Sequence, residues 1–247
     1  MVKGLNTFRE FFSGYEEQYV LIGGAACDII FESNEVSFRA TKDLDVVLIV
    51  EALTPEFGGK LWEFIEKGGY RNKLTNEGKP QFFRFDKPED ERYPKMIELF
   101  CRTDFELKNT NGITPVHIDD EISSLSAILL DEDYYKALIS GKVVENNISV
   151  LKPEYLILFK AKAYMDLRER RESGENVDSN NIKKHKKDIL RICSELILEK
   201  TDKLPLTVET DIHNFIHILE KEPYDDNSLK MYGVNNDDII QLLKSIY

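Results

Sequence analysis

The chain has 247 residues, enough for one large domain or two smaller ones, and 42% apolar and 11% aromatic residues can form a substantial core. A net charge of −12 argues against a general nucleic-acid-binding protein, and no apolar run approaches the roughly 18 residues of a membrane-spanning helix. The first residues lack the apolar core of a signal peptide and the three cysteines are scattered, so a cytoplasmic protein is expected.

The first part of the chain alternates segments with helical and strand-like patterns. Helices are predicted at residues 5–17, 25–31 and from Phe57 to the glycine pair at 68–69. Strands are predicted at 20–22, 46–50, 70–74, 81–85 and 96–101, with further candidates at 113–118 and 125–130. This order predicts an α/β (α+β) domain over residues 1–152, with a mixed sheet flanked by helices.

The character of the chain changes after Pro153, a residue suited to the first turn of a helix. A short helix is expected before it, at 133–139. Beyond it, helices are predicted at 155–167, 182–198, 210–219 and 237–246, with a polar loop at 168–181. A helical C-terminal domain over residues 153–247 is therefore expected.

Charge is distributed unevenly along the chain. Residues 160–191 contain ten Lys or Arg and six Asp or Glu, a local charge of +4, so the remainder carries −16. Such a segment is either a solvated helical face or a surface that faces an anion.

Asp43 and Asp45 open an apolar strand, and at this spacing both carboxylates point to the same face. Two like charges side by side require a cation, or one of them takes up a proton. Hard cations, above all Mg²⁺, are the usual solution and normally accompany a phosphate substrate. The alternative is an acidic pair that only caps the start of a strand.

Other residues in this half fit the same site. Gly23-Gly24 joins a strand to a helix, where glycine lets the backbone approach a phosphate, although such a pair is also common in plain tight turns. Glu98 is the one polar residue of a later apolar strand, and we expect it to be the third carboxylate of a site able to hold two Mg²⁺ ions. Thr41 and Lys42 directly precede the acidic pair and are candidate phosphate contacts.

Three segments, GGAA at 23–26, RATKDLDVV at 39–47 and MIELF at 96–100, resemble the nucleotidyltransferase fold of the DNA polymerase β superfamily. PEYL at 153–156 with Lys160 and KDI at 187–189 resemble its AbiEii-like branch, which includes toxins of abortive-infection toxin–antitoxin systems. The resemblance implies metal binding by Asp43 and Asp45 and triphosphate binding at Gly23-Gly24. It also implies a phosphate contact or catalytic role for Lys160 and a catalytic or orienting role for Asp188.

The expected function is Mg²⁺-dependent transfer of an NMP from an NTP to an acceptor hydroxyl, with Lys160 facing the aspartates. The acceptor stays open among an RNA such as tRNA, a protein and a small molecule of the antibiotic type, and an antitoxin protein is a further candidate partner. A member of the fold that binds nucleotide or protein without catalysis is the alternative from a different class.

Overall fold

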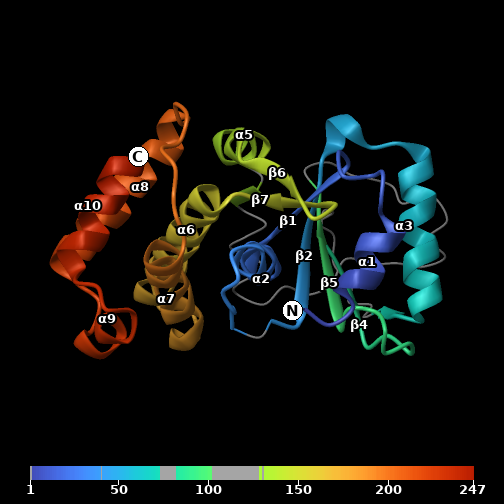
Figure 1. The fold of residues 1–247 in the computed structure, drawn as a ribbon, viewed down its shortest axis with the longest axis horizontal. Helices are drawn as coiled ribbons and strands as arrows, with labels where there is room; N and C mark the ends of the chain where they lie inside the picture. The colour runs from blue at the N-terminus through green and yellow to red at the C-terminus, as the bar shows by residue number, and fades with distance from the viewer. Residues whose placement is uncertain (1, 40, 73–81, 102–127, 130) are drawn as a thin grey trace. The chain divides into compact units, whose positions relative to one another are not determined.

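The computed structural model describes residues 2–39, 41–72, 82–101, 128–129 and 131–247, which fall into two compact units (Figure 1). The first unit contains the described residues up to Cys101 together with Lys142–Leu151. The second contains Lys152–Tyr247 and the helix α5 (Glu132–Ser140). The chain thus passes between the units at 141–142 and again at 151–152, and α5 groups with the C-terminal helices.

A mixed sheet forms the centre of the first unit. Its described strands are β1 (Tyr19–Ile22), β2 (Asp43–Leu48), β3 (Arg71–Asn72), β4 (Phe82–Asp86), β5 (Met96–Phe100), β6 (Lys142–Glu145) and β7 (Ile148–Leu151). They lie in the order β3-β4-β5-β2-β1-β7-β6. The β2–β5 and β1–β7 pairs are parallel and the others are antiparallel, so the predicted mixed α/β architecture is confirmed.

Helices cover both faces of this sheet. The helices α1 (Leu5–Phe11) and α3 (Pro55–Gly68) lie on one side and α2 (Gly23–Ser33) on the other (Figure 1). Phe8 of α1 packs edge-on against Tyr19 of β1 and Phe64 of α3, whereas α2 contacts β1 and β2. Because strand residues alternate between faces, the face opposite Tyr19 is the one that α2 covers.

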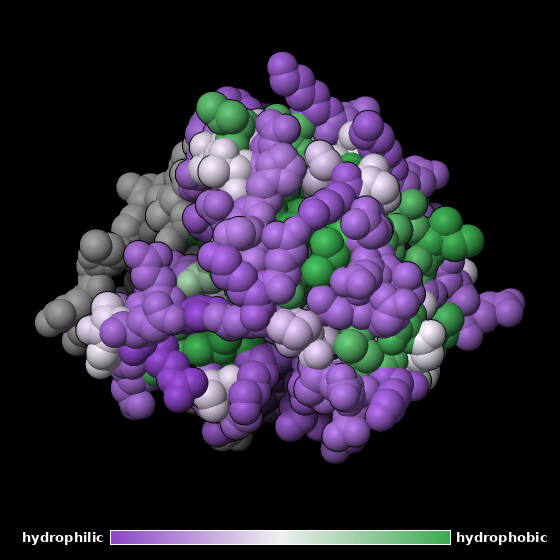
Figure 2. Space-filling model, turned by 90° about the vertical axis from the view of Figure 1, so that its left-hand side faces the viewer, coloured by the Kyte–Doolittle hydropathy of each residue, from purple (hydrophilic) through white to green (hydrophobic). Residues whose placement is uncertain are grey.

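The second unit is helical, as expected. It contains α6 (Pro153–Glu172), α7 (Ser179–Glu195), α8 (Leu206–Lys221), α9 (Asp226–Tyr232) and α10 (Asn236–Ile246) in addition to α5. The helix α6 is buried along most of its length and packs against α7 and α8. The face shown in Figure 2 is mostly hydrophilic, with small apolar areas between polar ones. Among the described residues, every helix is too short or too polar to cross a membrane.

Local signals explain where several elements begin and end. Thr54 caps α3 by accepting a hydrogen bond from the amide of Phe57, and Pro55 fills the first turn. The same helix ends at Gly69, whose φ of 62° is in the left-handed region. Pro153 begins α6 in the same way that Pro55 begins α3.

Three expectations from the sequence need correction. The first helix ends at Phe11, not at residue 17, because turns and the left-handed Gly14 follow it. The expected loop at 168–181 is mostly helix: α6 continues to Glu172, where Arg168 pairs with Glu172 one turn away, and α7 begins at Ser179. Ile128 and Leu129 are helical and not part of the strand expected at 125–130. The other residues of that segment, and the candidate strand at 113–118, lie outside the described residues.

Two further features, the β6–β7 hairpin and α9, were not predicted.

Candidate active site

A row of charged side chains crosses three neighbouring strands of the first unit. Asp45 of β2 lies opposite Glu98 of β5, and Glu98 lies opposite Arg84 of β4. Residues paired in register share a face of the sheet, and Asp43, two positions before Asp45, shares it as well. The predicted meeting of Asp45 and Glu98 across the sheet is therefore found, and it lies on the face that α2 covers.

The start of α2 lies directly against Asp45. Gly23 has a φ of +65°, and a Cβ added there would come within 2.0 Å of the Asp45 Oδ2 atom. A Cβ on Gly24 would lie 2.8 Å from the Thr41 hydroxyl oxygen and 3.6 Å from the Arg39 guanidinium. The glycine turn, the second aspartate and the segment before it thus converge at the positive end of a helix.

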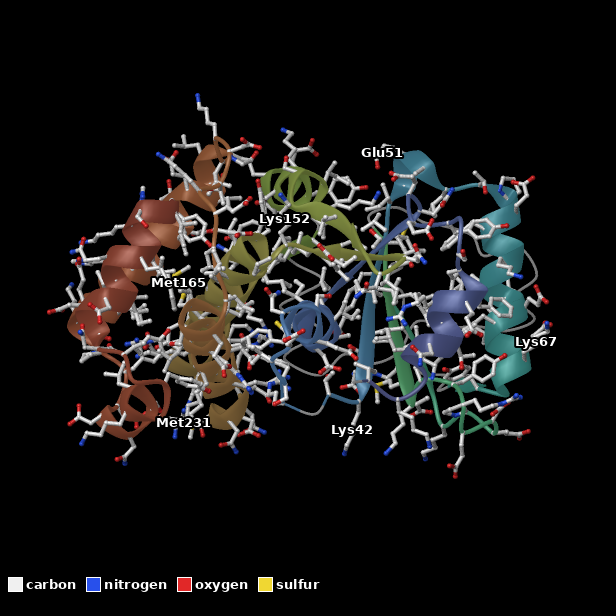
Figure 3. All side chains as sticks on the ribbon, viewed as in Figure 1. Lys42, Glu51, Lys67, Lys152, Met165 and Met231 are labelled. Carbon is white, nitrogen blue, oxygen red and sulfur yellow. The ribbon has the colours of Figure 1, made fainter. Side chains whose placement is uncertain are left out.

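Lys42 is placed differently from its neighbour Thr41. Its side chain is exposed and projects away from the ribbon at the start of β2 (Figure 3). Its proposed phosphate contact stays a prediction.

Glu98 is held by Arg84. The Glu98 Oε1 atom accepts hydrogen bonds from Arg84 Nε at 2.9 Å and from an Arg84 terminal nitrogen at 2.6 Å. Glu98 is nevertheless only 6% exposed and also hydrogen-bonded to Asp45. Burial, and then the charge of Asp45, raise the pKa of Glu98 to about 9 despite Arg84. Glu98 therefore keeps a proton at neutral pH, which it shares with Asp45 through their hydrogen bond.

This arrangement makes the stability of the protein depend on pH. The folded chain holds a proton on Glu98 that the unfolded chain, with an ordinary pKa of 4.5, has released. The stabilisation from that proton is fully present below pH 4.5 and is lost as pH rises toward 9. In EDTA, we expect wild-type stability to fall relative to Glu98→Gln by at least about 1.4 kcal/mol between about pH 5 and pH 9, the equivalent of one pKa unit.

Denaturant unfolding of both proteins across this range measures the difference. Glutamine is always neutral, so titrating groups remote from this site cancel and the difference reports the Asp45–Glu98 pair. Parallel pH profiles for the two proteins would contradict a shared proton at Glu98.

The donor chemistry at β2 suits a hard cation. Asp43 and Asp45 present carboxylate oxygens on one face of the strand, the ligand type that Mg²⁺ prefers, and Mg²⁺ commonly takes only one or two carboxylates beside phosphate oxygens and water. Within the described ranges, no group of three or more His, Cys, Asp or Glu side chains is arranged to hold a metal ion. Asp43 and Asp45 therefore fit as a two-carboxylate set, and Glu98 as a third ligand stays a prediction.

Lys160 and Asp188 form a buried ion pair in the second unit. Lys160 Nζ lies 2.8 Å from Asp188 Oδ2, and the two side chains are 6% and 4% exposed. The helices α6 and α7 bring them together across 28 residues of sequence. Both residues belong to the second unit, so the expectation that Lys160 faces Asp43 and Asp45 stays a prediction.

We expect Lys160→Met to destabilise the chain by about 3–5 kcal/mol, because it leaves Asp188 buried without this partner. The matched control is Lys162→Met on the same helix. Lys162 also pairs with an aspartate at 2.8 Å, but its side chain is 32% exposed. That substitution should cost about 1 kcal/mol or less. Chemical unfolding measures both.

The double variant Lys160→Met/Asp188→Asn separates the ion pair from packing. It should be more stable than Lys160→Met alone, since the buried charge is removed with its partner. If the changes in unfolding free energy of Lys160→Met and Asp188→Asn add up to that of the double variant, the ion pair itself contributes nothing.

Arg84 is the residue that the sequence interpretation missed. It stands between aromatic residues at the centre of FFRFD, as Glu98 stands between apolar residues at the centre of MIELF. Opposite charges at the centres of two successive apolar strands indicate a cross-strand pair. That signal was present in the sequence.

No family model matches the chain, and no curated protein is similar to it in sequence. Among solved structures, it is similar to an antigenic nucleotidyltransferase-like protein from Paracoccidioides brasiliensis. The match covers 92% of each chain at 15% identity with a TM-score of 0.45. Similarity at this level assigns neither a family nor an activity to the chain.

Proposed function

We propose that the protein is a Mg²⁺-dependent nucleotidyltransferase that moves an NMP from an NTP to an acceptor hydroxyl. The observation that carries the proposal is the contact between Gly23 and Asp45. It brings the start of a helix, which attracts phosphate, to a carboxylate pair of the kind that holds Mg²⁺. Either feature alone is common, and their meeting at one point is the feature expected of a phosphoryl-transfer site.

Residues of the first unit would have three different roles in this reaction. The backbone amides at the start of α2, with Thr41 and the Arg39 guanidinium beside them, would bind the triphosphate. Asp43 and Asp45 would hold Mg²⁺, which supplies charge neutralisation for the transferred phosphoryl group and the pyrophosphate. Arg84 would act as a positioning residue, because it fixes the Glu98 carboxyl group next to Asp45.

In the reaction, the acceptor oxygen forms a bond to the α-phosphorus while the bond from that phosphorus to the bridging oxygen of pyrophosphate breaks. Pyrophosphate leaves with the electron pair of the broken bond. The hydroxyl proton passes to Glu98 in its deprotonated form, which is a strong base because burial and the charge of Asp45 raise the pKa of this carboxyl group to about 9. The chain thus contributes positioning and proton transfer in addition to its charges.

The direct test is incubation with each α-labelled NTP, Mg²⁺ and total cellular RNA, followed by separation of RNA, protein and small-molecule fractions. The expected result is label in one fraction with one preferred NTP, lost when EDTA is added. The fraction that carries label identifies the acceptor class, so the RNA, protein and small-molecule alternatives are distinguished in one experiment. The implied toxin–antitoxin role stays a prediction.

One observation favours the non-catalytic alternative. Arg84, Glu98 and Asp45 already satisfy one another by a salt bridge and a shared proton, as a purely structural cluster would. Mg²⁺-dependent NTP binding with no release of pyrophosphate and no labelled product would support a nucleotide-binding module and contradict the enzyme proposal.

A further inference from the structure

A second concave site lies entirely within the helical unit. It is a pocket of about 720 Å³ between the C-terminal half of α6, the start of α7 and the segment 222–228 that joins α8 to α9. Its volume is within the range of small-molecule sites, about 300–1,000 Å³. It contains part of the basic segment 160–191 noted in the sequence, which the proposed transferase site does not use.

The carboxylates around the pocket already have partners. Arg168 binds Glu222 through two nitrogens, at 2.7 and 2.8 Å, and Glu172 through a third at 2.9 Å. Asp225 accepts hydrogen bonds from the Ser228 hydroxyl at 2.6 Å and amide at 3.0 Å, at the start of α9. These contacts fix the pocket walls, and Arg168 offsets part of the negative charge of the acidic side chains.

Lys186 forms part of the pocket base. Its ammonium donates to the backbone oxygen of Glu222 at 2.6 Å and lies 5.0 Å from the centre of the Tyr224 ring. With Tyr164, Ile182 and Pro223, this ring provides apolar wall beside the cations. The pocket therefore combines a flat apolar surface with positive charge.

Three cations remain available to a ligand. Arg171, Lys183 and Lys187 line the pocket, are exposed, and form no ion pair within the described part of the chain. Lys187 also helps to lower the pKa of Asp225, and the pocket lining as a whole has five basic and three acidic side chains, a net charge of +2 in a protein whose overall charge is −12. An anion is the ligand that would complete such a site.

We propose that this pocket binds a phosphorylated small molecule with a ring system, of the nucleoside monophosphate type, with its phosphate on Arg171, Lys183 and Lys187. The apolar wall would contact the ring system, and the exposed cations would bind the phosphate. A compact anion fits better than a long RNA, because the rest of the chain carries a charge of −16 and repels an extended polyanion.

Calorimetric titration of the full chain with AMP in EDTA tests the proposal, with inorganic phosphate, adenosine and a short oligoribonucleotide as further probes. AMP should bind more tightly than phosphate or adenosine alone. Lys183→Ala/Lys187→Ala should weaken AMP binding at least about 10-fold, as expected for loss of a charge-assisted contact. The matched control is Lys200→Ala/Lys203→Ala, which removes the same charge from exposed positions of the same unit and should leave binding unchanged.

A third variant, Arg39→Ala, separates this site from the proposed transferase site. This variant should leave AMP binding intact. The proposal for the pocket can therefore fail while the transferase proposal stands, and the transferase proposal can fail while the proposal for the pocket stands. The proposal is wrong if AMP does not bind, if only Arg39→Ala weakens binding, or if both lysine pairs weaken it equally. It is also wrong if the oligoribonucleotide, and not AMP, depends on Lys183 and Lys187.

Discussion

Replacing Asp45 by asparagine is expected to lower NMP transfer at least about 10³-fold, since the charge that neutralises the reacting phosphates depends on this carboxylate. The fold should survive. Loss of the Asp45 charge removes a like-charge contact with Glu98 but also a favourable one with the start of α2. These two effects oppose each other, so the free energy of unfolding should change by no more than about 1 kcal/mol.

Transfer of labelled NMP and denaturant unfolding measure the two quantities on the same preparation. The matched control is Asp90→Asn, the same chemical change at a partly exposed aspartate of the first unit that pairs with Arg92. It should retain wild-type activity. Full activity of Asp45→Asn would remove the metal role assigned to Asp45, whatever the state of Glu98.

Gly23→Ala is expected to reduce both stability and activity. The φ of +65° costs a residue with a side chain about 1–2 kcal/mol, and the new Cβ would lie 2.0 Å from Asp45 Oδ2. The carboxylate must therefore move, and a displacement of about 1 Å at a reacting centre can reduce the rate about 10²-fold. Unfolding by denaturant and steady-state transfer assays measure the two losses.

Gly59→Ala is the matched control for this substitution. Gly59 lies inside α3, and a Cβ there would meet nothing within 4 Å. Alanine should stabilise this helix by about 0.5–1 kcal/mol without affecting transfer. If Gly23→Ala behaved like Gly59→Ala, the close contact between the glycine turn and Asp45 would have no functional meaning.

The sequence predicted elements well where local signals agree with one another. Thr54, Pro55 and Gly69 mark both ends of α3, and Pro153 marks the start of α6. Prediction failed where a local signal was read wrongly. The polar, Gly-containing segment after Leu167 looked like a loop, although its Arg and Glu residues favour helix up to Glu172.

The hairpin β6–β7 shows a signal that was present but not used. Asn146 and Asn147 both have positive φ, 50° and 61°, the conformation of a two-residue hairpin turn that asparagine tolerates. The short strands on either side contain polar residues, so hydrophobic pattern alone did not reveal them. The turn pair was the stronger evidence.

For the candidate site, the sequence by itself determined which chemistry is available. The spacing of Asp43 and Asp45 places two carboxylates on one face of a strand, because side chains in a strand alternate. Gly23 marks a place where the backbone must turn, and Glu98 is a charge inside an apolar strand. These are properties of neighbouring residues, so they can be read without a structure.

Only the tertiary structure decided which of these groups meet. Strand register sets Asp45 beside Glu98 and Glu98 beside Arg84, and register depends on how distant segments pair rather than on either segment alone. That register, with the burial it imposes, is why a proton stays on the carboxylate pair despite a salt bridge. In the same way, the packing of α6 on α7 joins Lys160 to Asp188: the sequence indicated that a buried ammonium needs an anion and left Asp188 and a triphosphate as the candidates.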